Sequence, residues 1–181
     1  MTTYIALLKG INVGGKNIIK MVDLKQHLVT TGLNNIRTYI QSGNVLFESE
    51  KEEKILREEL EQEIHRKFGF QVPVVLRTND EMEQIISRCP YTKEEIETAE
   101  ANKEVEVFYV AFFNELPSNE DLKYFSDTKT ENESFKIVGR DMYMLFSDSI
   151  RFSKLAATLQ KIKTVNTVRN WKTINKLLSL V

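Results

Sequence analysis

The stretch Ile36–Ser49, IRTYIQSGNVLFES, decides the fold of the first half of the chain. Two short runs rich in apolar and β-branched residues, Ile36–Gln41 and Asn44–Ser49, flank the dipeptide Ser42-Gly43. Such a pattern predicts a β-hairpin, because glycine reaches the positive φ that a tight turn requires. The stretch therefore predicts two adjacent antiparallel strands.

Elements on both sides of this hairpin complete one folding unit. A strand over Tyr4–Leu8 and a helix precede the hairpin, and a second helix and a strand over Val72–Arg77 follow it. This β-α-β-β-α-β order is typical of a ferredoxin-like unit. The two helices are predicted from apolar residues at helical spacing, which are Met21, Leu24 and Leu28, then Leu56, Leu60, Ile64 and Phe68.

The second half repeats much of this order. A strand over Val105–Phe112 precedes a helix, and a second hairpin turns at Gly139-Arg140 before another helix. The short run Val165–Val168 stands in place of a final strand and leads into a last helix. We expect an α+β fold of two tandem ferredoxin-like subdomains that arose by internal duplication. The alternative is that a common order of elements arose twice.

These patterns divide the chain into four parts. Residues 1–78 form the first ferredoxin-like subdomain, 79–102 a helical connector, 103–163 the second subdomain and 164–181 a C-terminal helix. Capping boxes, in which a hydroxyl residue precedes a glutamate by three positions, predict where several helices begin. They occur at Ser49/Glu52, Thr78/Glu81 and Thr92/Glu95, the last opening a short helix that runs to Asn102.

Composition excludes several classes of protein. The 181 residues are 41% hydrophobic and 28% charged, which is typical of a globular protein. The single cysteine, Cys89, cannot form an intrachain disulfide, and the spacing of His27 and His65 matches no familiar zinc motif. The N-terminus has no basic-then-apolar pattern and no apolar run approaches about 20 residues, so we expect neither a leader nor a membrane helix. We therefore expect a cytoplasmic protein without a metal site, cofactor or membrane partner.

The net charge of −1 conceals an uneven distribution. Residues 1–47 carry +4, residues 48–148 carry −12, and residues 149–181 carry +7 with no acidic side chain. If the two basic ends meet in space, they form a patch suited to an anion. The alternative is that each charge lies on a separate solvated helix face.

A glycine-rich loop in the first basic segment resembles a phosphate-binding motif. Gly10–Asn17, GINVGGKN, matches G-x-x-x-x-G-K but ends in asparagine rather than the metal-binding serine or threonine. The helical pattern also starts only near Met21, so an ATPase is disfavoured. The loop can still hold an oxyanion through backbone N–H groups and the side chains of Lys9, Asn12, Lys16 and Asn17. The alternative is a tight loop that glycine alone shapes.

Nucleophilic catalysis finds little support in the sequence. Ser42 lies in a hairpin turn rather than a strand-to-helix elbow, and Cys89 falls on the apolar face of a predicted helix. Neither His27 nor His65 has an acidic partner nearby in sequence. Aromatic residues of the second half, such as Phe108 and Tyr143, are predicted to pack in the core rather than to stack on RNA.

The second basic segment contains Arg169-Asn170-Trp171 just before the last helix. Asn170 is the predicted N-cap of that helix, and Arg169 lies where a guanidinium and free backbone N–H groups can bind an anion together. Ser153 and Lys154 supply further donors.

Several of these motifs resemble the bacterial domain-of-unknown-function family 1697. They are GINVGGKN at 10–17, YIQSGNV at 39–45, SKL at 153–155 and RNW-x-T at 169–173, and the similarity runs nearly end to end. The resemblance implies two ferredoxin-like subdomains and no established activity. The chain departs from the family pattern around Ile150–Phe152. The family pattern marks Gly10, Asn12, Gly14, Gly15, Lys16, Asn17, Gln41, Ser42, Gly43, Asn44, Ser153, Lys154, Arg169, Asn170 and Trp171.

We therefore expect a module that binds nucleic acid or a phosphorylated metabolite through a basic patch formed by the glycine-rich loop and the C-terminal segment. Alternatives are a metal-independent enzyme acting on a phosphorylated or carboxylated substrate, and a protein-interaction module. The expected ligand-binding residues are Lys9, Asn12, Gly14, Gly15, Lys16, Asn17, Gln41, Ser42, Asn44, Ser153, Lys154, Arg169, Asn170 and Trp171.

Overall fold

A computed structural model describes residues 1–101, 104–128 and 130–181. The described residues form a mixed α+β fold with seven α-helices, one 3₁₀ helix and two four-stranded antiparallel sheets. The chain divides into two compact units, which we describe separately. Unit 1 comprises Met1–Glu83 with Lys176–Val181, and unit 2 comprises Gln84–Asn175.

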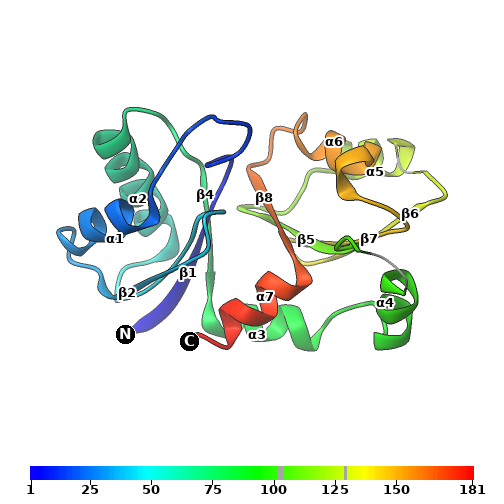
Figure 1. The fold of residues 1–181 in the computed structure, drawn as a ribbon, viewed down its shortest axis with the longest axis horizontal. Coiled ribbons are helices and arrows are strands. Elements are labelled where there is room, and N and C mark those ends of the chain that lie inside the picture. Colours follow the sequence, from blue (N-terminus) through cyan, green and yellow to red (C-terminus); the bar gives the residue numbers. More distant parts are fainter. Residues whose placement is uncertain (102–103, 129) are drawn as a thin grey trace. The chain divides into compact units, whose positions relative to one another are not determined.

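Unit 1 contains a sheet with the strand order β2-β3-β1-β4, in which all neighbours are antiparallel. Helices α1 and α2 lie over one face of this sheet (Figure 1). Both helices share a hydrophobic core with that face. The elements in chain order are β1 (Thr2–Leu8), α1 (Met21–Val29), β2 (Asn34–Tyr39), β3 (Asn44–Ser49), α2 (Glu53–Phe68) and β4 (Val74–Thr78).

The core of unit 1 follows the predicted periodicities. Alternate residues of β1 share one hydrophobic cluster with the apolar stripes of both helices, because side chains alternate along a strand and recur every three or four residues on a helix. The predicted helical residues are buried, and Phe68 is partly buried against the cluster. The cluster includes Tyr4, Ala6, Leu8, Leu24, Leu28, Leu56, Leu60 and Ile64.

Unit 2 contains a sheet of equivalent order, β6-β7-β5-β8. It is preceded by two connector helices, α3 (Asn79–Ser87), which begins in unit 1, and α4 (Lys93–Glu100). The remaining elements are β5 (Phe108–Phe113), α5 (Asn119–Thr128), β6 (Glu133–Val138), β7 (Asp141–Phe146), η1 (Ile150–Phe152), α6 (Lys154–Leu159), β8 (Asn166–Asn170) and α7 (Trp171–Leu178), which ends in unit 1.

The similarity between the two units extends to individual hydrogen bonds. In unit 1, the Leu8 N–H donates to the Gly43 carbonyl at 2.8 Å, which ties the end of β1 to the β2–β3 turn. In unit 2, the Phe113 N–H donates to the Arg140 carbonyl at 3.0 Å, which ties the end of β5 to the β6–β7 turn. The same structural solution therefore recurs at matching positions of two similar subdomains.

The end of the second sheet differs from the sequence-based expectation. The segment 164–181 was expected to lie outside the second subdomain, with no final strand, but β8 pairs with β5 from Tyr109↔Asn170 to Phe113↔Asn166. Its sequence, NTVRN, contains one apolar residue and lacks the alternation of a buried strand. The strand lies at the edge of its sheet. The expected boundary between residues 102 and 103, and the expected helix end at Asn102, lie outside the described residues.

The structure confirms two of the three predicted capping boxes. Thr92 and Glu95 form both reciprocal hydrogen bonds of a capping box, and Thr78 and Glu81 do the same. The box predicted at Ser49/Glu52 is wrong, because the Ser49 hydroxyl accepts from the Lys51 N–H and α2 begins later, without a side-chain cap.

The two aromatic residues named above, Phe108 and Tyr143, lie in the core, as the sequence predicted. Phe108 and Tyr143 are 0% and 1% exposed, and the ring of Phe108 contacts those of Tyr91 and Trp171 at centroid distances of 5.5 and 4.9 Å. These rings are therefore not available to stack on RNA. Within the described ranges, no helix has both the length and the apolar character needed to cross a membrane.

Candidate functional site

Two connections are longer in unit 1 than their counterparts in unit 2. Twelve residues, 9–20, join β1 to α1, whereas five residues, 114–118, join β5 to α5. Four residues, 40–43, join β2 to β3, whereas two, 139–140, join β6 to β7. We call segments 9–20 and 40–43 the loop pair. Because unit 2 makes the same connections with fewer residues, the fold does not require the additional length.

The first segment of the loop pair is a small hairpin anchored at both ends. Ile11 and Ile19 are buried, and the residues from Val13 to Ile18 between them are exposed. Gly14 and Gly15 have φ values of 58° and 73°, and the Lys16 N–H donates to the Val13 carbonyl at 3.1 Å. Two consecutive positive φ angles with this bond are typical of a type I′ turn.

This geometry differs from that of a phosphate loop in nucleotide triphosphatases. The glycines of those enzymes lead directly into a helix whose N-terminus faces the phosphate. Here the Gly-Lys step forms a β-turn, and α1 begins only at Met21. The structure thus agrees with the sequence-based argument against an ATPase.

Asn12 holds the two segments of the loop pair together. Its side-chain Nδ2 donates to the carbonyl of Ile19 at 2.9 Å and to that of Gln41 at 2.8 Å, while its Oδ1 accepts from the Ile19 N–H at 2.8 Å. Asn17 adds a weaker bond, from Nδ2 to the Gly10 carbonyl at 3.2 Å. One amide side chain therefore fixes both the hairpin base and the β2–β3 turn.

The turn between β2 and β3 packs closely against the first segment. A Cβ atom on Gly43 would lie 2.7 Å from Ile11 Cδ1 and 2.8 Å from Leu8 Cβ. Asn44 is fully buried, and its Nδ2 donates to the Tyr39 carbonyl and the Ser42 hydroxyl. Asn44, one of the predicted ligand-binding residues, thus closes the turn from inside.

The loop pair also concentrates unusual backbone conformations. Asn12, Asn17 and Ile40 have positive φ angles of 54°, 48° and 49°. Asparagine tolerates this region, but a β-branched residue in it is a genuine outlier. Ile40 is also 47% exposed, so core packing does not explain its conformation. Strained residues of this kind cluster at functional sites.

The charged groups of the loop pair are all cationic. Neither segment contains an aspartate or glutamate. Lys16 and Lys20 are exposed and Lys9 is half-buried, and across the described residues none of the three forms an ion pair. Burial lowers the pKa of Lys9, so a bound anion would stabilise its charged form. Together with the exposed backbone of Gly14 and Gly15, these lysines form a donor-rich surface.

The predicted C-terminal site residues lie in unit 2, where several have internal partners. Arg169 is 7% exposed, and its guanidinium donates to the Thr167 hydroxyl at 2.9 Å and the Val168 carbonyl at 2.8 Å. Burial lowers the pKa of Arg169 to about 10. Asn170 accepts from the Thr173 N–H at 2.8 Å, which confirms it as an N-cap.

At the predicted site residues Ser153 and Lys154, where α6 begins, the buried carboxylate of Glu133 is present. Ser153 caps this helix by accepting from the Ala156 N–H, and Lys154 is exposed. Glu133 accepts from the Leu155 N–H at 3.4 Å and, through its other oxygen, from the Thr130 N–H at 3.0 Å. Burial raises the pKa of Glu133, but hydrogen bonds from Ser153, Thr130 and Leu155 outweigh this effect and leave the pKa below its ordinary value.

This arrangement makes a pH-dependent prediction for Glu133→Gln. At pH 7 the variant should be less stable by about 2 kcal/mol, because it loses charge-assisted hydrogen bonds in a buried setting. Since the folded-state pKa is lowered, the stabilisation is present above the unfolded pKa of about 4.3 and disappears as pH falls through the folded value. Urea denaturation at pH 7 and near pH 3 measures the difference. An equal loss in Glu131→Gln, an exposed neighbour, would contradict the assignment.

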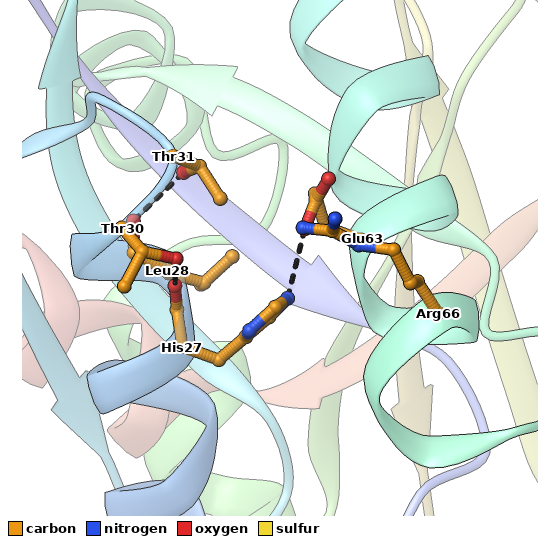
Figure 2. Close-up of polar contacts among 6 residues, drawn as sticks. All are labelled: His27, Leu28, Thr30, Thr31, Glu63 and Arg66. Atoms are coloured by element: carbon orange, nitrogen blue, oxygen red, sulfur yellow. Dashed lines mark hydrogen bonds and ion pairs between the residues drawn. The ribbon is translucent and has the colours of Figure 1, made fainter.

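The structure also reveals an ion-pair cluster that sequence reasoning missed. His27 Nε2 lies 2.8 Å from a carboxylate oxygen of Glu63, which also accepts from Arg66, so that α1 and α2 are joined (Figure 2). The Arg66 hydrogen bond lowers the pKa of Glu63, burial opposes this, and His27 lowers it further. Because 36 residues separate His27 from Glu63, no local sequence signal could have predicted the pair.

Two cavities elsewhere have balanced charge in their walls. One of about 260 Å³, beside Glu63, contains the ion pairs Lys51–Glu59 and Arg66–Glu63. Another of about 590 Å³, in unit 2, has three lysines and three acidic residues in its wall. Neither offers the excess of positive charge found at the loop pair. The charged residues of the unit 2 cavity are Glu120, Asp121, Lys123, Asp127, Lys161 and Lys163.

Comparisons with other proteins identify the family. A conserved bacterial protein from Streptococcus pneumoniae has a similar structure, with a TM-score of 0.76 and 24% sequence identity, and the match covers 99% of this chain and 98% of that one. This likeness concerns the fold. A comparison with curated proteins gave no match. The model of a family described as protein of unknown function (DUF1697) matches residues 1–143. The chain therefore belongs to the DUF1697 family.

Proposed function

We propose that this protein binds an anionic ligand and that, within unit 1, the loop pair carries the binding. The observation that supports this proposal best is the comparison of the two units. The two connections lengthened in unit 1 are the same two that Asn12 joins, although the shorter connections of unit 2 complete the same topology. Extra, ordered and exposed loop structure on a rigid scaffold is a common location for binding residues.

The chemistry of the loop pair favours an anion. Gly14, Gly15 and Lys16 are exposed, and in the described chain no hydrogen bond uses the backbone N–H of either glycine. Backbone donors and a cation together can bind a phosphate or carboxylate without a metal. The absence of acidic residues from both segments leaves this positive potential uncancelled.

The proposal extends to two finer points. The strand orders β2-β3-β1-β4 and β6-β7-β5-β8, with two helices per sheet, support a ferredoxin-like type for each subdomain. A reducing cytoplasm remains a prediction that rests on the single cysteine. That the C-terminal residues of unit 2 contribute to the same basic patch also stays a prediction.

Substitution of Lys16 tests the proposed site. We expect Lys16→Gln to weaken binding of inorganic pyrophosphate about tenfold at low salt, because one charge-assisted contact is lost. Lys54→Gln is the matched control, since Lys54 is an exposed lysine on α2 without an ion pair in the described chain. Isothermal titration at two salt concentrations measures both. Wild-type protein that binds neither pyrophosphate nor an oligonucleotide at low salt contradicts the proposal.

A further inference from the structure

We infer that the ligand of the loop pair is a single strand of nucleic acid, an inference that rests on the proposed function and specifies its ligand. The first observation concerns exposed apolar residues in the loop pair. Val13, Ile18 and Ile40 are 69%, 58% and 47% exposed. The first two lie in the cationic segment 9–20, and Ile40 lies in the segment that Asn12 joins to it. A free phosphate makes no favourable contact with such apolar side chains, whereas a nucleotide chain presents sugars and bases between its phosphates.

The apolar residues are gathered around one hydrogen-bonded centre. Ile18 and Ile40 immediately precede Ile19 and Gln41, whose carbonyls both accept from the Asn12 amide, and Val13 immediately follows Asn12. Because one Nδ2 atom binds both carbonyls, the segments that carry the three side chains are close together. The three exposed aliphatic residues and Lys16 therefore all belong to the two segments that Asn12 holds together.

The openness of this surface favours a polymer. Small ligands usually bury 70–90% of their surface in a cavity. The segment from Val13 to Ile18 is instead exposed throughout and forms the tip of the small hairpin. A single strand suits such a tip because successive phosphates can meet Lys16 and the glycine N–H groups while unstacked bases cover the aliphatic side chains.

The side chain of Gln41 provides the polar complement to a base. Its amide is exposed and, as far as the structure describes the chain, makes no hydrogen bond. An amide offers a donor and an acceptor together, the combination that base edges match. The backbone of a carboxylate-rich peptide could pair with this amide too, but its charged side chains would leave the exposed aliphatic residues uncovered, so the observations favour nucleic acid over an acidic protein.

The test measures fluorescence anisotropy of a labelled single-stranded oligonucleotide of about 15 nucleotides, made once as DNA and once as RNA of the same sequence. We expect binding of at least one, with Ile18→Ser weakening it about fivefold and leaving pyrophosphate binding unchanged. Ile55→Ser is the matched control, because Ile55 is 48% exposed on α2 of the same unit. Lys16→Gln should reduce the slope of log K against log salt by about 0.7.

The outcomes separate the two proposals. The nucleic-acid inference is overturned if the protein binds pyrophosphate but neither oligonucleotide. It is also overturned if Ile18→Ser and Ile55→Ser change oligonucleotide affinity equally. In both cases the proposed anion site is unaffected. Binding of a polyglutamate peptide alone also overturns it, in favour of a protein partner. If no anionic probe binds to wild-type protein whose thermal unfolding is cooperative, the proposed function itself fails.

Discussion

Replacing Gly43 with alanine should lower the free energy of unfolding by about 2 to 5 kcal/mol. A new Cβ would meet Ile11 Cδ1 at 2.7 Å and Leu8 Cβ at 2.8 Å, both parts of a packed core. Overpacking of this kind costs about 1–3 kcal/mol, and the left-handed conformation at φ +81° adds about 1–2 kcal/mol for any residue with a Cβ. Urea denaturation measures the loss.

Gly69→Ala separates the clash from the backbone effect. Gly69 ends α2 with φ +82°, nearly the value of Gly43, but a Cβ there meets nothing within 4 Å. The control should therefore lose only the conformational part, about 1–2 kcal/mol. Equal losses in the two variants would show that Gly43 is required for its φ alone and that the loop pair does not pack as described.

Asn12→Ala should be the second most damaging change, with a loss of about 3 kcal/mol. The variant removes the three hydrogen bonds of the Asn12 amide. The carbonyl and N–H of the buried residue Ile19 and the carbonyl of Gln41 then lose this partner. Each unsatisfied buried group costs about 1–3 kcal/mol, and water can reach the exposed Gln41 side of this centre. Because Asn12 holds the two segments together, pyrophosphate binding should weaken as well.

Two variants control this result. Asn17 has nearly the same φ as Asn12, 48° against 54°, but Asn17→Ala removes only one exposed hydrogen bond of 3.2 Å. Asn17→Ala should therefore lower the free energy of unfolding by about 1–2 kcal/mol less than Asn12→Ala does. Asn12→Gly keeps the backbone conformation accessible but lacks the amide, so it should remain destabilised. Restoration of wild-type stability by Asn12→Gly would mean that the φ angle, and not the hydrogen bonds, makes Asn12 important.

The elements that sequence reasoning predicted correctly are those with a local signal. The helices of unit 1 were predicted by apolar residues three or four positions apart, and the hairpin at Gly43 by a turn between two short apolar runs. The strand β8 was missed because a short edge strand with one apolar residue has no such signal, and only its pairing with β5 defines it. The capping box at Ser49 failed because the same two residue types also fit a turn.

The candidate site was predictable in part. The sequence identified the glycine-rich loop and named Gln41 and Ser42 as candidate residues, but it assigned Ile40 and Gln41 to a strand, whereas β2 ends at Tyr39. The structure joins the two segments through Asn12. The sequence could not predict that Asn44 and Arg169 would be buried, since exposure depends on contacts between distant residues. Nor could it place Glu133 at the start of α6, because 22 residues separate Glu133 from Leu155.

The most direct test of the anion site is a titration of ¹⁵N-labelled protein with inorganic pyrophosphate, followed through the backbone amide resonances. The proposal predicts that the largest saturable shifts occur in segments 9–20 and 40–43, above all at Gly14, Gly15 and Lys16, and that Lys16→Gln reduces them. Largest shifts at Lys161 and Lys163 in the unit 2 cavity, or none at low salt, would contradict it.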